Sequence, residues 1–476
     1  MQLSEIATLC GATHRLNPAI AETVPTGFAI DSRAVKPGEV FVAIPGERVD
    51  GHQFVAEVLD QGALAALVVH HRLPFAKTLA PYTDRLLFVT DTACAFQQMA
   101  QKILTAWNKP IVAVTGSAGK TTMKDLTAHV LEGVTSKGFK SLGNLNTSYG
   151  LPLTVGRMIS AGADPRDFDL AVLEFGMSSY GEIKRLTEIA PPTAAIVGNV
   201  GTAHIEFFGN SDGIAEAKAE IVDGLQPGGL AILNADDPRV SKMRERRSDI
   251  SILTFGIDAD ADVRAVSINN DTLGATSFEL RTPRGDVSVN LPLLGKHNVY
   301  NALAAAAAGH HFGMSARQIA RQLKTAAPSK MRGELIKFAN GVTVIDDSYN
   351  SNPPALIQAV QAMANAKGFV RRIVVAGEML ELGEQGASLH RSCGQQIADA
   401  GIQRVIGVRG LSRYLVAGAM DAGVRDSTFC ETPEQAAEQL LGELQAGDLV
   451  LVKGSRGVRT ERVVERLKAA LGGNEQ

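Results

Sequence analysis

Short apolar runs alternate with helical patterns over the middle of the chain. The runs lie at residues 111–114, 170–173, 194–197 and 230–233. Runs of this length, separated by stretches of helical periodicity, are typical of buried parallel strands joined by crossover helices. The pattern predicts an α/β central domain with a mostly parallel sheet and helices on both faces, over residues 89–327.

The end of this central region has a different pattern. Residues 263–293 contain shorter alternating stretches and two turn-like clusters, Asn269-Asn270-Asp271 and Pro283-Arg284-Gly285-Asp286. Alternation with polar turns is typical of antiparallel hairpins. We expect this segment to extend the central sheet with antiparallel strands.

A second alternating unit begins near Pro328. Its strand-like runs are residues 342–345, 373–376, 405–408 and 449–452, and its helical patterns are residues 355–363, 388–398 and 433–444. This order predicts a C-terminal Rossmann-like domain over residues 328–476, with any ligand at the carboxyl ends of its strands.

Residues 1–88 predict a small α/β N-terminal domain. They contain strand-like runs at 40–44 and 65–69 and a helical stretch at 54–59. An amphipathic helix over residues 92–107 would then lead into the central domain. The chain is therefore expected to fold into three domains.

A glycine loop follows the first central strand. It reads Gly116, Ser117, Ala118, Gly119, Lys120, Thr121, Thr122, and a helical pattern continues from it. The loop N–H groups and the helix N-terminus make a concave phosphate site. In such loops the lysine reaches the β- and γ-phosphates and a threonine hydroxyl binds Mg²⁺, which predicts ATP and Mg²⁺ as ligands. The alternative is an ordinary glycine turn, and the chain has Val114 where the longest form of the motif has glycine.

Composition limits the possible partners. The 476 residues are 45% hydrophobic and 20% charged, which is typical of a globular protein of about three domains. A net charge of −3 gives no field that would hold nucleic acid. The four cysteines form no C-x-x-C pair, and neither a targeting segment nor an apolar run of ~18 residues is present. We expect a cytoplasmic monomer without a membrane span.

Three further residues are candidates for chemistry. Glu174 ends a buried strand, where its carboxylate would face a nucleotide-bound Mg²⁺ or pair with a nearby cation. His204 follows the next strand, and its spacing leaves a ligand role and a structural role equally open. Lys218 falls on the apolar face of a helix, where snorkelling to solvent is the usual outcome.

The form T-G-S-x-G-K-T-T resembles the ATP site of the Mur ligase and folylpolyglutamate synthase superfamily. Similar segments follow in the family's order, at residues 143–146, 295–305, 330–334, 346–353, 377–383 and 452–456. The resemblance covers nearly the whole chain. It implies an ATP-dependent ligase that forms an amide bond through an acyl phosphate.

The resemblance also implies roles for single residues. Asn298 would contact adenine, Asp347 ribose, and Arg332 the ATP phosphates. His204 would bind metal together with Thr121 and Glu174, and Lys218 would carry a carbamate that supplies the charge for a second Mg²⁺. Lys120, Lys218 and His204 are the catalytic residues that it suggests.

The segment Asp31-Ser32-Arg33 and the following residues 36–54, K-P-G-E-V-F-V-A-I-P-G-E-R-V-D-G-H-x-F, resemble the first domain of the family members that add D-alanyl-D-alanine to UDP-N-acetylmuramoyl-tripeptide. On that basis the uridine diphosphate end of the substrate would lie against two polar clusters, which without the resemblance are ordinary solvated turns. Their residues are Ser32, Arg33, Gly46, Asp50, Gly51 and His52. Further substrate contacts would come from Asn144, Asn146, Tyr349, Asn350 and Asn352, with the incoming dipeptide bound by the C-terminal domain.

The sequence departs from the usual family pattern at two places, and three alternative functions stay open. Ser178-Ser179 stand where these members usually have Asn-His, and Thr147-Ser148-Tyr149 is an uncommon variant. Both leave open whether the third peptide residue is diaminopimelate or lysine. The rivals are an amino-acid-adding Mur ligase, folylpolyglutamate synthase, and an ATP-binding module without ligation. The first rival's D-N-P-R motif has only Asp236-Asp237-Pro238-Arg239 as a counterpart, in the central domain.

Overall fold

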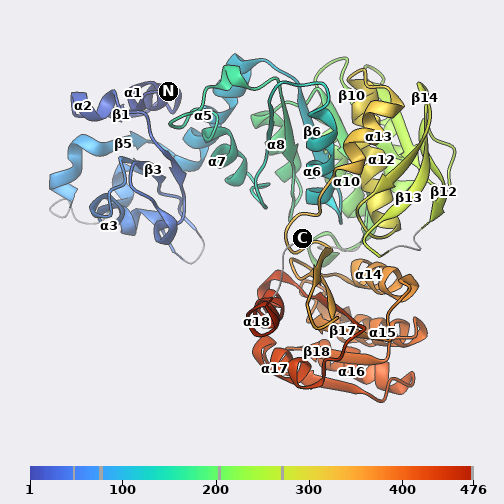
Figure 1. The fold of residues 1–476 in the computed structure, drawn as a ribbon. Coiled ribbons are helices and arrows are strands. Elements are labelled where there is room, and N and C mark those ends of the chain that lie inside the picture. Colours follow the sequence, from blue (N-terminus) through green and yellow to red (C-terminus); the bar gives the residue numbers. More distant parts are fainter. Residues whose placement is uncertain (47–48, 74–78, 202–204, 270–272, 473–476) are drawn as a thin grey trace.

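A computed structural model describes residues 1–46, 49–73, 79–201, 205–269 and 273–472, and its strands form three sheets in chain order. Figure 1 shows the first domain beside the central one, with the C-terminal domain below the central one. The predicted fold class, three α/β units with a parallel-sheet centre, is confirmed. Over the described residues no helix is long and apolar enough to cross a membrane.

The first sheet has the order β1-β5-β4-β3-β2. Its strands are β1 Thr13–His14, β2 Gly27–Ala29, β3 Glu39–Val42, β4 Ala65–Val69 and β5 Leu86–Val89. All neighbours are parallel except β1 and β5. Among its described residues the α-helices are α1 Leu3–Leu9, α2 Pro18–Ala21 and α3 Val55–Asp60. The strand predicted at 65–69 is exact, and the other two predicted elements lie within two residues of their positions.

The central sheet has nine strands in the order β14-β13-β12-β11-β10-β9-β6-β8-β7. They are β6 Ile111–Thr115, β7 Gly138–Lys140, β8 Leu170–Glu174, β9 Ala194–Val197, β10 Leu230–Asn234, β11 Ser251–Gly256, β12 Val263–Asn269, β13 Thr276–Thr282 and β14 Gly285–Leu291. Strands β6 to β12 all pair in parallel with one another, and β12, β13 and β14 pair antiparallel. The expected antiparallel extension is confirmed, while β7 and β11 were not predicted.

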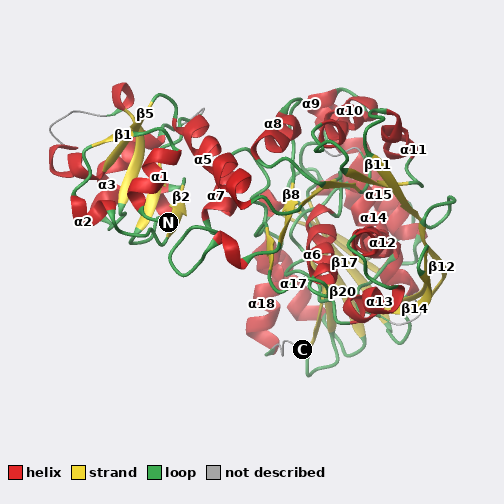
Figure 2. Ribbon diagram, turned by 90° about the horizontal axis from the view of Figure 1, so that it is seen from above, coloured by secondary structure: helices red, strands yellow, loops and turns green. Residues whose placement is uncertain are grey.

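Helices cover both faces of the central sheet (Figure 2). They are α5 Thr92–Trp107, α6 Lys120–Leu131, α7 Gly150–Gly156, α8 Glu182–Ile189, α9 Ile205–Phe208, α10 Ser211–Asp223, α11 Pro238–Lys242, α12 Lys296–His311 and α13 Ala316–Lys324. Alternate residues of β6 explain the two layers: Val112 and Val114 share a core with α6, α12 and α13, whereas Ala113 shares one with α5, α8 and α10. That second core continues into the first domain through α5, which therefore is the predicted linking helix.

The C-terminal sheet has the order β15-β16-β20-β17-β18-β19 and is parallel except for β15. Its strands are β15 Glu334–Lys337, β16 Thr343–Asp347, β17 Arg371–Gly377, β18 Arg404–Val408, β19 Ser427–Cys430 and β20 Asp448–Lys453. Helices α14 Pro353–Asn365, α15 Gly386–Asp399 and α16 Ser412–Asp421 cover one face, and α17 Pro433–Glu443 and α18 Glu461–Leu471 cover the other. The predicted strands are present; β15, β19, α16 and α18 are additional.

Candidate active site

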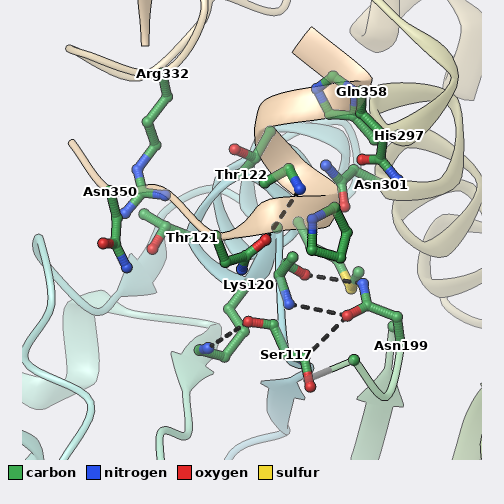
Figure 3. A pocket seen from close by; sticks show the side chains of 18 of the residues that line it. Ser117, Lys120, Thr121, Thr122, Asn199, His297, Asn301, Arg332, Asn350 and Gln358 are labelled. Carbon is green, nitrogen blue, oxygen red and sulfur yellow. Dashed lines mark hydrogen bonds between the residues drawn. The ribbon is translucent and has the colours of Figure 1, made fainter. Parts of the chain in front are cut away.

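A cavity of about 910 Å³ lies between the central and C-terminal domains, and both domains line it. Most of the predicted site residues meet there: Ser117, Ala118, Gly119, Lys120, Thr121, Thr122, Asn144, Asn146, Glu174, Asn298, Arg332, Asp347, Tyr349, Asn350 and Asn352. Of the other predicted residues, Gly116, Lys218 and the six in the first domain do not line it, and His204 lies outside the described residues. The cavity is where a ligand would contact two domains at once (Figure 3).

The glycine loop connects the end of β6 to the first residue of α6. Gly119 has a φ of +78°, a conformation that favours glycine, and this turn directs the N-terminus of α6 into the cavity. Asn199, just after β9, braces the loop. Its Oδ1 accepts from Ser117 N at 3.1 Å and Ala118 N at 2.9 Å, and its Nδ2 donates to the carbonyl of Ala118 at 2.9 Å.

Lys120 is half-buried and points into the same loop. Its Nζ donates to the carbonyl oxygen of Gly116 at 2.9 Å. It also donates to the carbonyl oxygen of Ser117 at 3.5 Å, the bond drawn in Figure 3. Burial lowers the pKa of Lys120, the Glu174 carboxylate opposes that shift, and the Arg332 guanidinium adds to it. Lys120 and Arg332 repel each other, and an anion such as a phosphate group between them would relieve that repulsion.

Glu174 is the buried carboxylate of the site, with 2% of its surface exposed. Its Oε2 accepts from the Thr121 hydroxyl at 2.8 Å, and its Oε1 accepts from Asn146 Nδ2 at 2.8 Å. A hydroxyl and a carboxylate in contact, beside a phosphate loop, are oxygen donors of the kind that suits Mg²⁺, which uses one or two carboxylates besides water and phosphate. The Thr121–Glu174 pair therefore fits a nucleotide-bound Mg²⁺.

The described residues contain no group of three or more histidines, cysteines, aspartates or glutamates that would hold a metal ion by itself.

Lys218, on α10, is only 2% exposed, so the snorkelling expected of such a lysine does not occur. Burial, and next the charge of Lys120, lower the pKa of Lys218 well below its ordinary value. A buried amine of this kind is neutral over part of the accessible pH range and is nucleophilic.

The start of α12 forms the wall beside the loop. Asn298 is 7% exposed, donates from Nδ2 to the Leu294 carbonyl at 2.9 Å, and accepts from Asn301 Nδ2 at 3.1 Å. A Cβ on Gly119 would lie 2.8 Å from Asn301 Oδ1. The glycine is thus required both by its backbone angle and by the close approach of α12.

The C-terminal domain forms the opposite wall with aromatic and charged groups. The Arg332 guanidinium lies 4.0 Å from the centre of the Tyr349 ring, and that of Arg456 lies 5.6 Å from it. Asp347 Oδ2 accepts from Lys453 Nζ at 2.5 Å, and Lys453 also donates to the carbonyl of Asn350 at 3.0 Å. This wall offers both a stacking surface and cations to a polyphosphate.

The residues predicted in the first domain gather at one edge of its sheet, away from the cavity. Arg33 follows β2 and pairs with Asp31 at 2.7 Å, and its side chain is exposed. His52 follows the parallel neighbour β3 and is fully buried. Its Nδ1 donates to Asp50 at 2.6 Å, and its Nε2 accepts from the backbone N–H of Val69 at 2.9 Å. Both ring nitrogens are occupied, so His52 can act on a ligand only through the loop that it holds.

Comparison with known proteins adds to this geometry. Three family models match successive parts of the chain: the Mur ligase family catalytic domain over residues 25–104, the Mur ligase middle domain over 114–309, and the Mur ligase glutamate ligase domain over 331–456. The UDP-N-acetylmuramoyl-tripeptide--D-alanyl-D-alanine ligase of Bacillus subtilis is 35% identical over 95% of each chain, and that of Escherichia coli is 35% identical over 97% of this chain and 98% of its own. The chain belongs to the Mur ligase family.

Solved structures agree with the assignment to this family. A crystal structure of MurF from Acinetobacter baumannii superposes with a TM-score of 0.85 at 28% identity, over 98% of each chain. MurF from Thermotoga maritima, solved in complex with ADP, gives a TM-score of 0.79 at 29% identity, over 96% of this chain and 99% of its own. The likeness spans all three domains.

In this Mur ligase, the loop after β8 that departs from the usual family sequence is held by two glutamates, one at the start of α8 and one on α10. Glu182 Oε2 accepts from the backbone N–H of Ser178 at 2.5 Å, and Glu220 accepts from Gly181 N at 2.7 Å. Ser178 and Glu182 both line the cavity, as does Asn146. Of the two unusual residues, Ser178 thus faces the ligand space.

Several residues of this Mur ligase site were not singled out from the sequence. Asn199, Asn301, His297, Lys453 and Arg456 all line the cavity. Segments 295–305 and 452–456 had been noticed as family motifs, which was the available signal for four of them. Asn199 gave no signal, because its role is to bond a loop 81 residues away in the chain.

Proposed function

We propose that this Mur ligase joins D-alanyl-D-alanine to UDP-N-acetylmuramoyl-tripeptide with hydrolysis of ATP to ADP and phosphate, a step of peptidoglycan precursor synthesis. One observation carries the proposal: the phosphate loop with its Thr121–Glu174 pair faces the Arg332–Tyr349 wall of a second domain across one cavity. Such a cavity holds a nucleotide on one side and leaves the other side for an acceptor. The substrates follow from the names of full-length relatives.

The reaction needs two transfers. The terminal carboxylate of the tripeptide attacks the γ-phosphorus, the bond to the β-γ bridging oxygen breaks, and an acyl phosphate and ADP form. The free amine of the dipeptide then attacks the acyl carbon, phosphate leaves, and the amine loses a proton. Phosphoryl transfer depends on positioning and charge neutralisation, which Lys120, the N–H groups at the start of α6 and Arg332 would supply.

Mg²⁺ would be held by Thr121 and Glu174 and would neutralise phosphate charge; His204 is proposed as a further ligand. The buried amine of Lys218 would add to CO₂ and lose a proton, giving a carbamate that holds a second Mg²⁺. Asn298 is assigned to adenine, and Asp347 to ribose once Lys453 releases it. The proposal also includes domain boundaries at residues 88 and 327, a monomeric state and a cytoplasmic location.

The rest of the proposal concerns the two acceptor sites. We assign the uridine diphosphate end to the Arg33 and Asp50–His52 edge of the first sheet, where the carboxyl ends of β2 and β3 meet. The growing peptide then runs past Asn144 and Asn146 to the cavity, and the dipeptide enters along the C-terminal wall with Tyr349, Asn350 and Asn352.

A substrate matrix tests the proposal. Phosphate release is measured with ATP and UDP-N-acetylmuramoyl-tripeptides that carry diaminopimelate or lysine, each crossed with D-alanyl-D-alanine, L-lysine, diaminopimelate and glutamate. Release that requires both a tripeptide and D-alanyl-D-alanine is expected, and the Lys120→Ala protein is the negative control. Release with a single amino acid, or with ATP alone, would contradict the proposal.

A further inference from the structure

The segment that joins the central and C-terminal domains is bonded to the phosphate-loop helix. It runs from the end of α13 at Lys324 to the start of β15 at Glu334. The hydroxyl of Ser329 in this linker donates to Asp125 Oδ2 on α6 at 2.7 Å. One turn further along α6, His129 Nε2 lies 3.0 Å from Thr325 Oγ1 at the beginning of the linker. Helix α6 therefore carries both the phosphate loop and the contacts of the interdomain linker.

Two lysines keep the Asp125 carboxylate charged. Lys124 Nζ lies 3.2 Å and Lys140 Nζ 3.0 Å from Asp125 Oδ1. Partial burial would raise the pKa of Asp125, but Lys124, Lys140 and the Ser329 hydroxyl together lower it below its ordinary value. The bond to Ser329 is thus a hydrogen bond to a charged acceptor, the stronger kind.

The same network reaches the other side of the site. Lys124 is 1% exposed and donates from Nζ to the carbonyl of Ser141 at 2.8 Å. The hydroxyl oxygen of Ser141 accepts from the backbone N–H of Glu174 at 3.1 Å. The carboxylate that pairs with Thr121 and the linker that leads to Arg332 are therefore both fixed to α6.

Beyond Ser329 the linker has little freedom to place Arg332 elsewhere. The backbone N–H of Arg332 donates to the carbonyl of Ser329 at 3.0 Å, and the neighbours Met331 and Gly333 have φ angles of 62° and 78°. Tyr349 N donates to the carbonyl of Met331 at 3.2 Å. A turn with this geometry projects the Arg332 side chain onto the Tyr349 ring and into the cavity, where Figure 3 shows it facing the loop.

We propose that Asp125 is a positioning residue, which fixes the linker through Ser329 and so holds Arg332 opposite the phosphate loop. Arg332 contacts the ligand, and Asp125 and Ser329 act only through it. The inference rests on the proposed function in one respect, that the ligand at the loop is ATP. Loss of the Asp125–Ser329 bond releases the linker, and ATP then binds to a site from which one cation is missing for part of the time.

The test is a double-mutant cycle with ATP affinity as the readout. The dissociation constant of ATP is measured for the unmodified protein, Ser329→Ala, Arg332→Ala and the double variant, without any peptide substrate. Ser329→Ala is expected to weaken ATP binding by about 10-fold, the effect of a lost bond to a charged group. In the Arg332→Ala background the same change is expected to have less than about a 2-fold effect, since no guanidinium remains to be positioned.

Two further variants separate positioning from loss of folding. Ser329→Thr keeps the hydroxyl and is expected to bind ATP as the unmodified protein does. Thr254→Ala removes a comparable hydroxyl-to-carboxylate bond, to Asp262 at 2.7 Å, and is expected to leave affinity unchanged, because Thr254 lies on β11 and neither residue belongs to the linker or lines the cavity. Asp125→Asn is expected to behave like Ser329→Ala and to show no added loss when the two are combined.

The outcomes distinguish the two proposals. If the unmodified protein binds ATP, and Ser329→Ala binds it equally well or loses the same factor in both backgrounds, the positioning role is overturned and the proposed function stands. If the unmodified protein does not bind ATP, both are overturned.

Discussion

Lys218 is a buried lysine on α10 whose pKa is lowered by burial and by the charge of Lys120, which favours the neutral amine. If it carries a carbamate, Lys218→Ala is expected to lose most of the ligase activity, and acetate or formate is expected to restore part of it by occupying the place of the carbamate. Lys218→Arg is expected to be inactive, because arginine keeps its charge and does not add CO₂. Initial rates with and without added carboxylate measure this. Full activity of the arginine variant would show that a cation suffices.

His297, at the start of α12, provides a test by pH. Burial lowers its pKa from 6.5 to about 4, and Lys453 adds to this shift while Asp347 opposes it. Because the folded pKa lies below the unfolded one, stability is complete above 6.5 and is lost as pH falls towards about 4. Near pH 5 the loss relative to pH 7 is about 1–2 kcal/mol.

The His297→Gln protein is expected to lack this part of the acid dependence. Urea unfolding of both proteins at several pH values measures it, and the difference between them is the relevant quantity because other groups titrate equally in both. Parallel curves for the two proteins would show that His297 is not the group responsible.

Single residues were predicted where chemistry is local in sequence. Lys120 and Thr121 follow from the loop itself, and Glu174 follows from its place at the end of a strand. Lys453 was not predicted, because its role depends on Asp347 on a different strand, 106 residues away in the chain. The burial of Lys218 could not be predicted either, since periodicity places a residue on a face without showing what covers that face.

At the scale of elements, the junction between β6 and α6 depends on one glycine. Gly119→Ala places a side chain at a φ of +78° and brings its Cβ within 2.8 Å of Asn301 Oδ1. Gly162→Ala is the matched control, with a φ of +81° and nothing within 4 Å. The control is expected to lose about 1–2 kcal/mol of stability from the backbone angle alone. Gly119→Ala is expected to lose more than that and to weaken ATP binding about 10-fold or more.

Thermal unfolding and ATP titration of both alanine variants separate the two effects. Equal ATP affinity in the two variants would contradict the claim that α12 and the loop are fitted closely to each other.

Whole elements were predicted where they are fully buried. Strand β9 matches its apolar run exactly, and β6, β8 and β10 extend theirs by one residue. Three of the unpredicted strands, β7, β15 and β19, lie at sheet edges. An edge strand has a neighbouring strand on one side only and is less buried than a central strand, so it does not need a continuous apolar run. Strand β11 lies inside the central sheet, yet four of its six residues are at least partly exposed, so it is not one of the fully buried strands that were predicted.

At the scale of the whole molecule, the first domain is separate from the nucleotide cavity. Arg33→Ala is expected to raise the KM for the UDP-linked substrate about 10-fold or more while ATP affinity stays the same, because an exposed arginine contributes a charged contact and no core packing. His52→Ala is expected to raise the same KM and also to lower stability, because Asp50 loses one of its partners and the buried Val69 N–H loses its acceptor. Initial rates with each substrate varied in turn measure this. A change in ATP affinity alone would mean that the first domain has a different role.

The three-domain organisation was predictable because each domain repeats the α/β pattern along the chain. The way in which the domains face one another was not, because the cavity is formed by residues that lie more than 200 positions apart, such as Lys120 and Arg332. Only the family resemblance connected them in advance.

The central claim is that ATP activates a peptide carboxylate at this cavity as an acyl phosphate. The most direct measurement uses UDP-N-acetylmuramoyl-tripeptide with ¹⁸O in both oxygens of its terminal carboxylate, and mass analysis of the products. With D-alanyl-D-alanine present, each phosphate released is expected to contain one ¹⁸O, because the acyl phosphate breaks between the acyl carbon and that oxygen. Unlabelled phosphate, or label in AMP, would contradict the account.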